Sequence, residues 1–311
     1  MFELLVNLML TSLFLQSQAS SQVTLDNLTN QEYRLPQADV RNLIETAPQK
    51  DVSSDSVGVE VSAQSVLVID DKTNKILYDK NPKEVRSIAS ITKLMTALVF
   101  LDYNPGWESE VQIIESDHRD GGIVYLINGE TISINDLFHV SLISSSNEAT
   151  VALARSTGLS SEDFVKKMNE KAKTLGMNNT SFTDVTGLSN NNKSTAIDIA
   201  ILAKMAFLNN NIKRVTSTES YSINIINRNI TRNIKSTDKI LNQEFGLGGQ
   251  VYKVENGKTG YLELAGYNFV SQVSDNNNRK ILVVVLGSET INSRFSDTKS
   301  LAYWVFNNYN W

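Results

Sequence analysis

Strand-like segments at both ends of the chain enclose a long helical middle, and this arrangement most constrains the fold. Residues 66–70 and 76–78 are β-branched and apolar around a polar turn, which predicts a hairpin. Helical patterns dominate from residue 90 to about residue 208. Strands from both ends of a chain that enclose helices predict an α/β fold, in which one sheet is covered by helices on both faces. The later strands are expected at 260–263, 267–273 and 280–286, and a last amphipathic helix at 295–306.

Composition excludes several classes of protein. The chain has 311 residues, of which 41% are hydrophobic and 20% are charged, as in an ordinary globular protein of one or two domains. A net charge of −5 without any basic run argues against a nucleic-acid partner. The chain has no cysteine, which excludes disulfides, zinc–thiolate sites and a cysteine nucleophile. The two histidines have no metal-ligand spacing, so neither a metal nor a cofactor is expected.

The N-terminal segment predicts export. Residues 4–15 are apolar but too short to span a bilayer, and Ser17-Gln18-Ala19 has the small-x-small form of a signal-peptidase site. Glu3, without any Lys or Arg beside it, makes the start atypical, and an uncleaved anchor is the alternative. We expect a signal peptide at 1–19, a polar linker at 20–55 and a globular domain at 56–311. This organisation predicts an extracytoplasmic protein, in the periplasm or cell-wall space, with no stable membrane anchor.

Ser90 and Lys93 form a Ser-x-x-Lys motif directly before an apolar run. The run from Leu94 to Leu101 has no Gly or Pro and predicts a buried helix. Residues three apart on a helix are neighbours, so a base at position 93 can reach the Ser90 hydroxyl. A serine needs such a base, and a lysine can serve only when burial or a nearby cation makes it neutral. The motif therefore predicts an acylating serine that needs no histidine.

Two further motifs lie where their chemistry needs them. Ser145-Ser146-Asn147 separates two apolar helical runs, and Lys258-Thr259-Gly260 opens a stretch rich in aromatic and β-branched residues. We expect the first in a loop and the second at the start of a strand that lines a cleft, with Lys258 as the candidate cation.

Single motifs of this kind also occur by chance. Ser236-Thr237-Asp238-Lys239 is a second Ser-x-x-Lys, and Ser-x-Asn recurs at 189–191, 222–224 and 274–276, whereas Lys-Thr-Gly occurs once. The predicted site therefore depends on the combination of motifs and on their positions, not on any one of them.

Residues 89–97, Ala-Ser-Ile-Thr-Lys-Leu-Met-Thr-Ala, resemble the active-site helix of the low-molecular-mass penicillin-binding proteins, the D-alanyl-D-alanine carboxypeptidase and endopeptidase family. The resemblance implies the DD-peptidase/β-lactamase-like fold, with an antiparallel sheet built from N- and C-terminal strands, flanking helices and an all-helical region. It covers roughly residues 55–311. It continues in order through 145–149, 164–169, 171–177, 182–188, 194–200, 257–261 and 265–267.

The resemblance implies catalytic roles for four residues. Ser90 attacks the carbonyl of a D-Ala residue to form an acyl-enzyme, and Lys93 takes its proton. Ser145 relays a proton to the leaving amine. Asn147 holds Lys93 and the substrate amide. Expected partners are peptidoglycan stem peptides and, as covalent inhibitors, β-lactams that mimic the D-Ala-D-Ala end.

The resemblance implies substrate-binding roles for the strand from Lys258 to Tyr261. Lys258 supplies positive potential, and Thr259 binds the terminal carboxylate or the adjoining backbone. Gly260 belongs to the same motif, and the backbone N–H groups of Ser90 and Tyr261 form the oxyanion hole. The stretch after Gly260 is long enough to finish the sheet and no more, which resembles the shorter endopeptidase-type members. Tyr261 also replaces the His common in the larger carboxypeptidases.

We therefore expect a DD-endopeptidase that cleaves cross-links, a DD-carboxypeptidase that removes terminal D-Ala, or both. A β-lactamase is an alternative, although no match to its glutamate-bearing loop is found. A non-catalytic wall-binding module is another, which the intact motifs disfavour. His139 is expected to be a packed helix residue, and His118 to lie in a solvated loop, so neither predicts a Ser-His-Asp triad.

Overall fold

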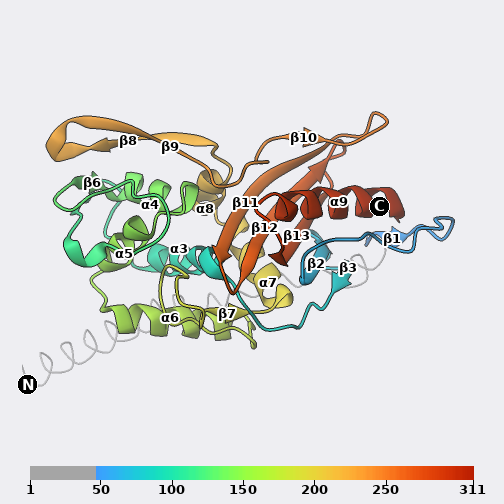
Figure 1. Ribbon diagram of the computed structural model, residues 1–311, viewed down its shortest axis with the longest axis horizontal. Helices are drawn as coiled ribbons and strands as arrows, with labels where there is room; N and C mark the ends of the chain where they lie inside the picture. Colours follow the sequence, from blue (N-terminus) through green and yellow to red (C-terminus); the bar gives the residue numbers. More distant parts are fainter. Residues whose placement is uncertain (1–46) are drawn as a thin grey trace, which may run out of the picture. The chain divides into compact units, whose positions relative to one another are not determined.

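The computed structural model describes residues 47–311 (Figure 1). The expected signal peptide at 1–19 and residues 20–46 of the expected linker lie outside the described residues. The rest of that linker includes β1 (Gln49–Lys50), which pairs antiparallel with β14 (Tyr309–Asn310). Regular structure therefore begins before position 56, because this short strand finds its backbone partner at the far end of the chain.

Six strands form one sheet in which every neighbouring pair is antiparallel. The N-terminal strands lie in the same sheet as the C-terminal strands, because β2 pairs with β13. The predicted sheet, built from both ends of the chain, is confirmed. In spatial order the strands are β10 (Glu244–Phe245), β11 (Tyr252–Leu262), β12 (Gly266–Asp275), β13 (Lys280–Ser288), β2 (Ser65–Asp70) and β3 (Ile76–Lys80).

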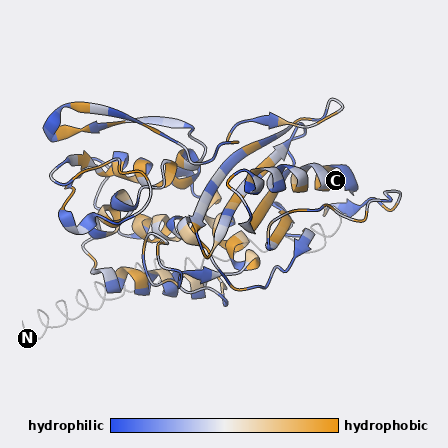
Figure 2. Cartoon of the chain, viewed as in Figure 1, coloured by the Kyte–Doolittle hydropathy of each residue, from blue (hydrophilic) through white to orange (hydrophobic). Residues whose placement is uncertain are grey.

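The central strands are buried on both faces. In β13, Ile281, Val283 and Val285 belong to one hydrophobic cluster, whereas the intervening Leu282 and Val284 belong to the other. The first cluster includes α9 (Ser293–Asn308) and the second includes α7 (Ala196–Leu208). Because strand side chains alternate between faces, this continuous apolar run is what a strand between two helical layers requires. Figure 2 shows this apolar colouring along β13.

The helical region surrounds α3 (Thr92–Asp102), which packs against α4, α5, α6 and α7. Serine N-caps at Ser133, Ser146 and Ser160 accept hydrogen bonds from backbone N–H groups in the first turns of α4, α5 and α6. These caps fix where each helix begins, including the helix that starts at Asn147. The other helices are α4 (Ile134–Ile143), α5 (Asn147–Ser156), α6 (Ser161–Thr174) and α8 (Asn210–Thr216).

Short strand pairs interrupt the segment predicted as helical, and a hairpin follows it. β5 (Glu110–Gln112) pairs with β6 (Thr131–Ser133), and the segment between them is a long loop that contacts α5. β4 (Arg86–Ser87) pairs with β7 (Lys193–Ser194). The unpredicted hairpin consists of β8 (Ser220–Ile225) and β9 (Ile230–Lys235). In the described part of the chain, no helix is long and apolar enough to cross a bilayer.

The strand that carries Lys258 begins earlier than expected. β11 pairs with β12 continuously from Tyr252 to Leu262, apart from one bulge between Val254 and Asn256. The Lys-Thr-Gly motif therefore lies near the end of β11 and does not open it. The expectation fails because the polar residues before Lys258 resemble a loop in sequence, although their backbone is paired.

Candidate active site

Lys93 is the centre of the predicted site. It lies in the first turn of α3 and is fully buried, with 0% of its surface exposed. Its Nζ lies 2.9 Å from the Ser90 hydroxyl, 2.9 Å from Asn147 Oδ1 and 2.7 Å from the Thr186 carbonyl oxygen. The predicted proximity of Ser90, Lys93 and Asn147 is therefore present, and Thr186 adds a contact that the sequence analysis missed.

The surroundings of Lys93 favour a neutral amine. Burial lowers its pKa to about 7, against the opposing influence of Asp184 and Glu148. A neutral amine has two N–H donors and one lone pair. Its three contacts fit this form, because Thr186 and Asn147 can accept the two hydrogen bonds while the Ser90 hydroxyl donates to the lone pair. The geometry is that of a base poised to remove the proton of Ser90.

Two glycines hold the turn that presents Ser90. This turn is η1 (Ala89–Ile91), and Ala89 has a left-handed φ of 48°. A Cβ on Gly187 would lie 2.0 Å from the Ala89 carbonyl oxygen, and one on Gly260 would lie 2.8 Å from the Ile88 oxygen and 3.1 Å from Ser90 N. The loop of Gly187 and the end of β11 therefore both contact this turn through backbone atoms, with no side chain between them. Gly260, the last residue of the predicted Lys-Thr-Gly motif, brings the end of β11 against the Ser90 N–H. Tyr261 directly follows Gly260 in the chain.

Ser145 and Lys258 form the second half of the site. Lys258 Nζ donates to Ser145 Oγ at 2.7 Å and to the Thr259 carbonyl oxygen at 3.0 Å. Ser145 has a φ of 60°, a conformation that is costly for a residue with a side chain and is found where a site requires it. It lies between α4 and α5, in the loop that the sequence predicts. Lys258 is 1% exposed, and burial, with Lys93 and Arg294 nearby, lowers its pKa well below its ordinary range.

Thr259 is paired with a segment that the sequence analysis dismissed. Its Oγ1 lies 2.6 Å from the hydroxyl of Thr237, within the second Ser-x-x-Lys motif at 236–239. The backbone N–H of Thr237 donates to the Ile143 carbonyl oxygen at the end of α4. This segment therefore bridges β11 and the loop of Ser145. In contrast, its own Lys239 is exposed and forms no buried base.

The last predicted residue, Tyr261, lies at the exposed end of β11. Its side chain is 51% exposed and stacks on Tyr267, with ring centroids 4.3 Å apart. Arg294 of α9 donates to the Gly260 carbonyl oxygen at 3.3 Å and lies over the Tyr267 ring. The Tyr261 side chain thus forms an aromatic wall beside the site.

The Thr186 carbonyl is held by a loop with its own hydrogen bonds. Asp184 accepts from the backbone N–H groups of Thr186, Gly187 and Ser189. Asn192 accepts from the backbone of residues 183 and 184 and donates to the Thr92 hydroxyl at the start of α3. The loop is therefore tied to the helix that carries Lys93. The sequence signal for it was the 182–188 part of the family resemblance, since a carbonyl oxygen has no residue-type signature.

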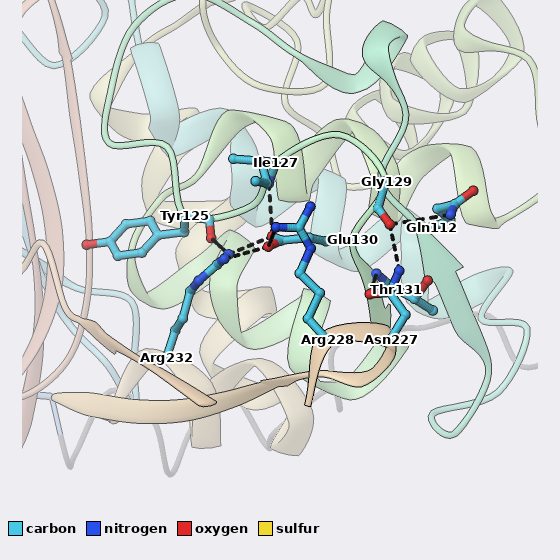
Figure 3. A network of polar contacts seen from close by, with 9 residues as sticks. All are labelled: Gln112, Tyr125, Ile127, Gly129, Glu130, Thr131, Asn227, Arg228 and Arg232. Atoms are coloured by element: carbon cyan, nitrogen blue, oxygen red, sulfur yellow. Dashed lines mark hydrogen bonds and ion pairs between the residues drawn. The ribbon is translucent and has the colours of Figure 1, made fainter. Parts of the chain in front are cut away.

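A second loop orients Asn147 from outside. The Asn147 amide donates to the Gly121 carbonyl oxygen at 2.9 Å, which leaves Oδ1 facing Lys93. The following stretch is fastened to the β8–β9 hairpin. Figure 3 shows Arg228 and Arg232 directed at Glu130, which is fully buried and also accepts from the Ile127 N–H. Arg232 donates in addition to the Tyr125 carbonyl oxygen at 2.8 Å.

The two histidines lie outside the Ser90 cluster. His139 is buried in α4, donates from Nδ1 to the Asn135 carbonyl oxygen and stacks on Tyr221 with ring centroids 4.0 Å apart, as a packed helix residue. His118 is exposed and lies 3.9 Å from Glu148. Within residues 47–311, no group of three or more His, Cys, Asp or Glu side chains is arranged to hold a metal ion.

Comparison with known proteins finds similar sequences. The family model for D-alanyl-D-alanine carboxypeptidase, peptidase S11, matches residues 48–290. The D-alanyl-D-alanine endopeptidase of Haemophilus influenzae is 36% identical over 241 residues, which cover 76% of this chain and 80% of that protein. The D-alanyl-D-alanine carboxypeptidase DacF of Bacillus subtilis is 32% identical over 256 residues, which cover 79% of this chain and 63% of that protein.

Solved structures share the fold. Penicillin-binding protein D2 from Listeria monocytogenes, in its cefotaxime-bound form, aligns with a TM-score of 0.69 and 27% identity. The alignment covers 81% of this chain and 100% of that one. The predicted DD-peptidase-like fold is confirmed.

Proposed function

Because the chain belongs to the D-alanyl-D-alanine carboxypeptidase family of S11 peptidases, we propose that Ser90 is the nucleophile with which it cleaves peptidoglycan stem peptides at D-Ala. The observation that carries this proposal is the contact of the buried Lys93 amine with the Ser90 hydroxyl at 2.9 Å. Binding alone does not require a lysine with a pKa of about 7 beside a serine, so this contact argues against a non-catalytic wall-binding module.

The reaction proceeds through an acyl-enzyme. Lys93 takes the Ser90 proton as Oγ attacks the D-Ala carbonyl carbon, and the resulting oxyanion is held by the N–H groups of Ser90 and Tyr261. Such a donor is typically worth about 3–4 kcal/mol of transition-state stabilisation. Ser145 gives its proton to the leaving amine as the amide bond breaks and regains one from Lys93, which becomes neutral again. Water then attacks the ester and gives a proton to Lys93, and Lys93 returns this proton to Ser90 Oγ as the acyl product leaves.

The substrate sits against the end of β11. Lys258 supplies positive potential next to Ser145, and the Thr259 hydroxyl is available to a carboxylate or a backbone group of the peptide. Asn147 holds Lys93 through Oδ1 and receives its own orientation from Gly121. β-Lactams, which mimic the D-Ala-D-Ala end, acylate Ser90 in the same way.

Among DD-peptidases, we propose that the chain is an endopeptidase that cleaves cross-links. The higher identity to the Haemophilus influenzae endopeptidase than to the Bacillus subtilis carboxypeptidase supports this choice. Tyr261 supports it too, since the exposed aromatic wall offers a surface to a longer leaving chain. The cross-linked substrate lies outside the cytoplasm, so we place the protein in the periplasm or cell-wall space, reached through the expected signal peptide.

Digestion of purified cross-linked muropeptides, followed by mass spectrometry, tests this function. Wild-type protein should convert cross-linked dimers to monomers, Ser90→Ala should produce nothing, and Ser236→Ala should behave as wild type. Loss of terminal D-Ala alone would overturn the endopeptidase assignment. No product with folded wild type would overturn the proposed function, and rapid penicillin hydrolysis would favour the β-lactamase alternative.

A further inference from the structure

A buried carboxylate beneath β11 has no role in the mechanism above. Asp238 is 6% exposed and belongs to the segment of the second Ser-x-x-Lys motif. Its Oδ1 accepts from the Ile240 N–H at 2.9 Å, whereas its buried Oδ2 has no hydrogen-bond partner among the described residues. A buried carboxylate oxygen without a partner is costly, and such groups in native proteins point to a functional demand.

The backbone of β11 is shaped to admit this carboxylate. A Cβ on Gly257 would lie 2.4 Å from Asp238 Oδ2 and 2.8 Å from the Phe269 ring. Any other residue at this position would displace the carboxylate. Gly257 directly precedes Lys258 in β11, so the carboxylate lies against the backbone of the residue before the site lysine.

The charges around Lys258 are unbalanced without Asp238. Two basic side chains face Lys258, Lys93 from α3 and Arg294 from α9, and in their charged forms both lower its pKa together with burial. Asp238 is the carboxylate that opposes them. Arg294 itself is buried, faces Asp238 and Tyr267, and has a buried Nε without a partner among the described residues. Above pH 7, where Lys93 is neutral, Arg294 is the buried cation that still opposes a charge on Lys258, and Asp238 is the carboxylate that offsets it.

We propose that Asp238 is a positioning residue that keeps Lys258 protonated against its burial and the buried Arg294 guanidinium, so that Ser145 and the substrate meet an ammonium group and not a neutral amine. The inference rests on the proposed function and extends it to the second Ser-x-x-Lys segment. Burial raises the pKa of Asp238 to about 6, so its carboxylate is charged at neutral pH and above. Lys93 is the neutral partner, because burial lowers its pKa to about 7 in spite of Asp184 and Glu148.

The pH dependence of Ser90 acylation by a fluorescent penicillin tests the proposal. Acylation requires protonated Lys258, so its rate falls as pH rises through the Lys258 pKa. Asp238→Asn keeps the shape of the side chain and the acceptor for Ile240, but removes the charge. We expect it to move this alkaline limb to lower pH, with about a tenfold lower rate on the limb for each pH unit of displacement.

Arg294→Gln should shift the alkaline limb in the opposite direction to Asp238→Asn. It removes a cation that faces Lys258, so the alkaline limb should move to higher pH, whatever the loss of its bond to Gly260 does to the absolute rate. Asp297→Asn is the matched control, because Asp297 is a buried carboxylate on the same helix that bonds to Ser62, Ala63 and Ser288 and is not among the charged groups that act on Lys258. It should alter thermal stability without moving the limb.

The two proposals fail differently. No acylation of wild type would overturn the proposed function. Normal wild-type acylation with an unmoved limb in Asp238→Asn, or limbs that move in the same direction in both variants, would overturn the role of Asp238 alone. If Asp238→Asn does not fold, an unmoved limb in Arg294→Gln overturns it.

Discussion

Replacing Gly187 by alanine should displace the nucleophile without touching any catalytic side chain. The new Cβ would lie 2.0 Å from the Ala89 carbonyl oxygen and 2.4 Å from its carbonyl carbon, and side chains do not approach closer than 3.0 Å. The turn that presents Ser90, or the loop that carries the Thr186 carbonyl, must therefore move by about 1 Å. A misplacement of about 1 Å at a reacting group can cost about 10²-fold in rate.

Gly176→Ala is the matched control for Gly187→Ala. Gly187 has a φ of 88° and Gly176 a φ of 79°, so both variants carry the cost of a left-handed side chain, about 1–2 kcal/mol. A Cβ on Gly176 meets nothing within 4 Å. The difference between the two variants isolates the contact with Ala89.

The assay compares thermal unfolding with the second-order rate of penicillin acylation. Gly176→Ala should lower the melting temperature and leave acylation as in wild type. Gly187→Ala should lower both, with acylation reduced by about two orders of magnitude. Equal acylation by the two variants would refute the claim that Gly187 sets the position of Ser90.

Two further predictions concern Lys93 and Arg232. Burial lowers the pKa of Lys93 to about 7, so the amine is neutral above that pH. The rate of acylation should therefore rise as the pH increases through 7. A rate that is constant from pH 5 to pH 8 would contradict a lysine base. Arg232→Ala removes the main partner of the buried Glu130 and should lower the free energy of unfolding, measured with urea, by about 3 kcal/mol. It should also slow acylation, because the loop that orients Asn147 loses its attachment to the hairpin. Lys235→Ala, at an exposed site on the same hairpin, should change neither quantity.

The parts of the fold that the sequence predicted are those with strong hydrophobic patterns. β13 and β2 are continuous apolar runs, because helices cover both of their faces, and α9 has a clear amphipathic pattern. The β8–β9 hairpin was missed because its strands are largely exposed and polar, and it is held by ion pairs to Glu130. Ion pairs between segments far apart in sequence leave no periodic signal.

The site shows the same division. Side chains with a defined chemistry at a fixed spacing, such as Ser90 with Lys93, were predicted and lie in contact. The Thr186 carbonyl was not predicted, because every residue has one. Asp238 lies in the second Ser-x-x-Lys motif, which by itself predicts no site, yet the fold places this segment beside Thr259 and Gly257. Proximity created by chain topology is not visible in local sequence.

Peptide mapping of the penicillin adduct tests the central claim most directly. The protein contains three Ser-x-x-Lys motifs, at 90–93, 236–239 and 296–299, and only the first has its lysine buried against the serine hydroxyl. Wild-type protein and Ser236→Ala should each take up one penicilloyl group on the peptide that contains Ser90, and Ser90→Ala should take up none. An adduct on any other serine, or an adduct that persists in folded Ser90→Ala, would contradict the assignment of Ser90 as the nucleophile.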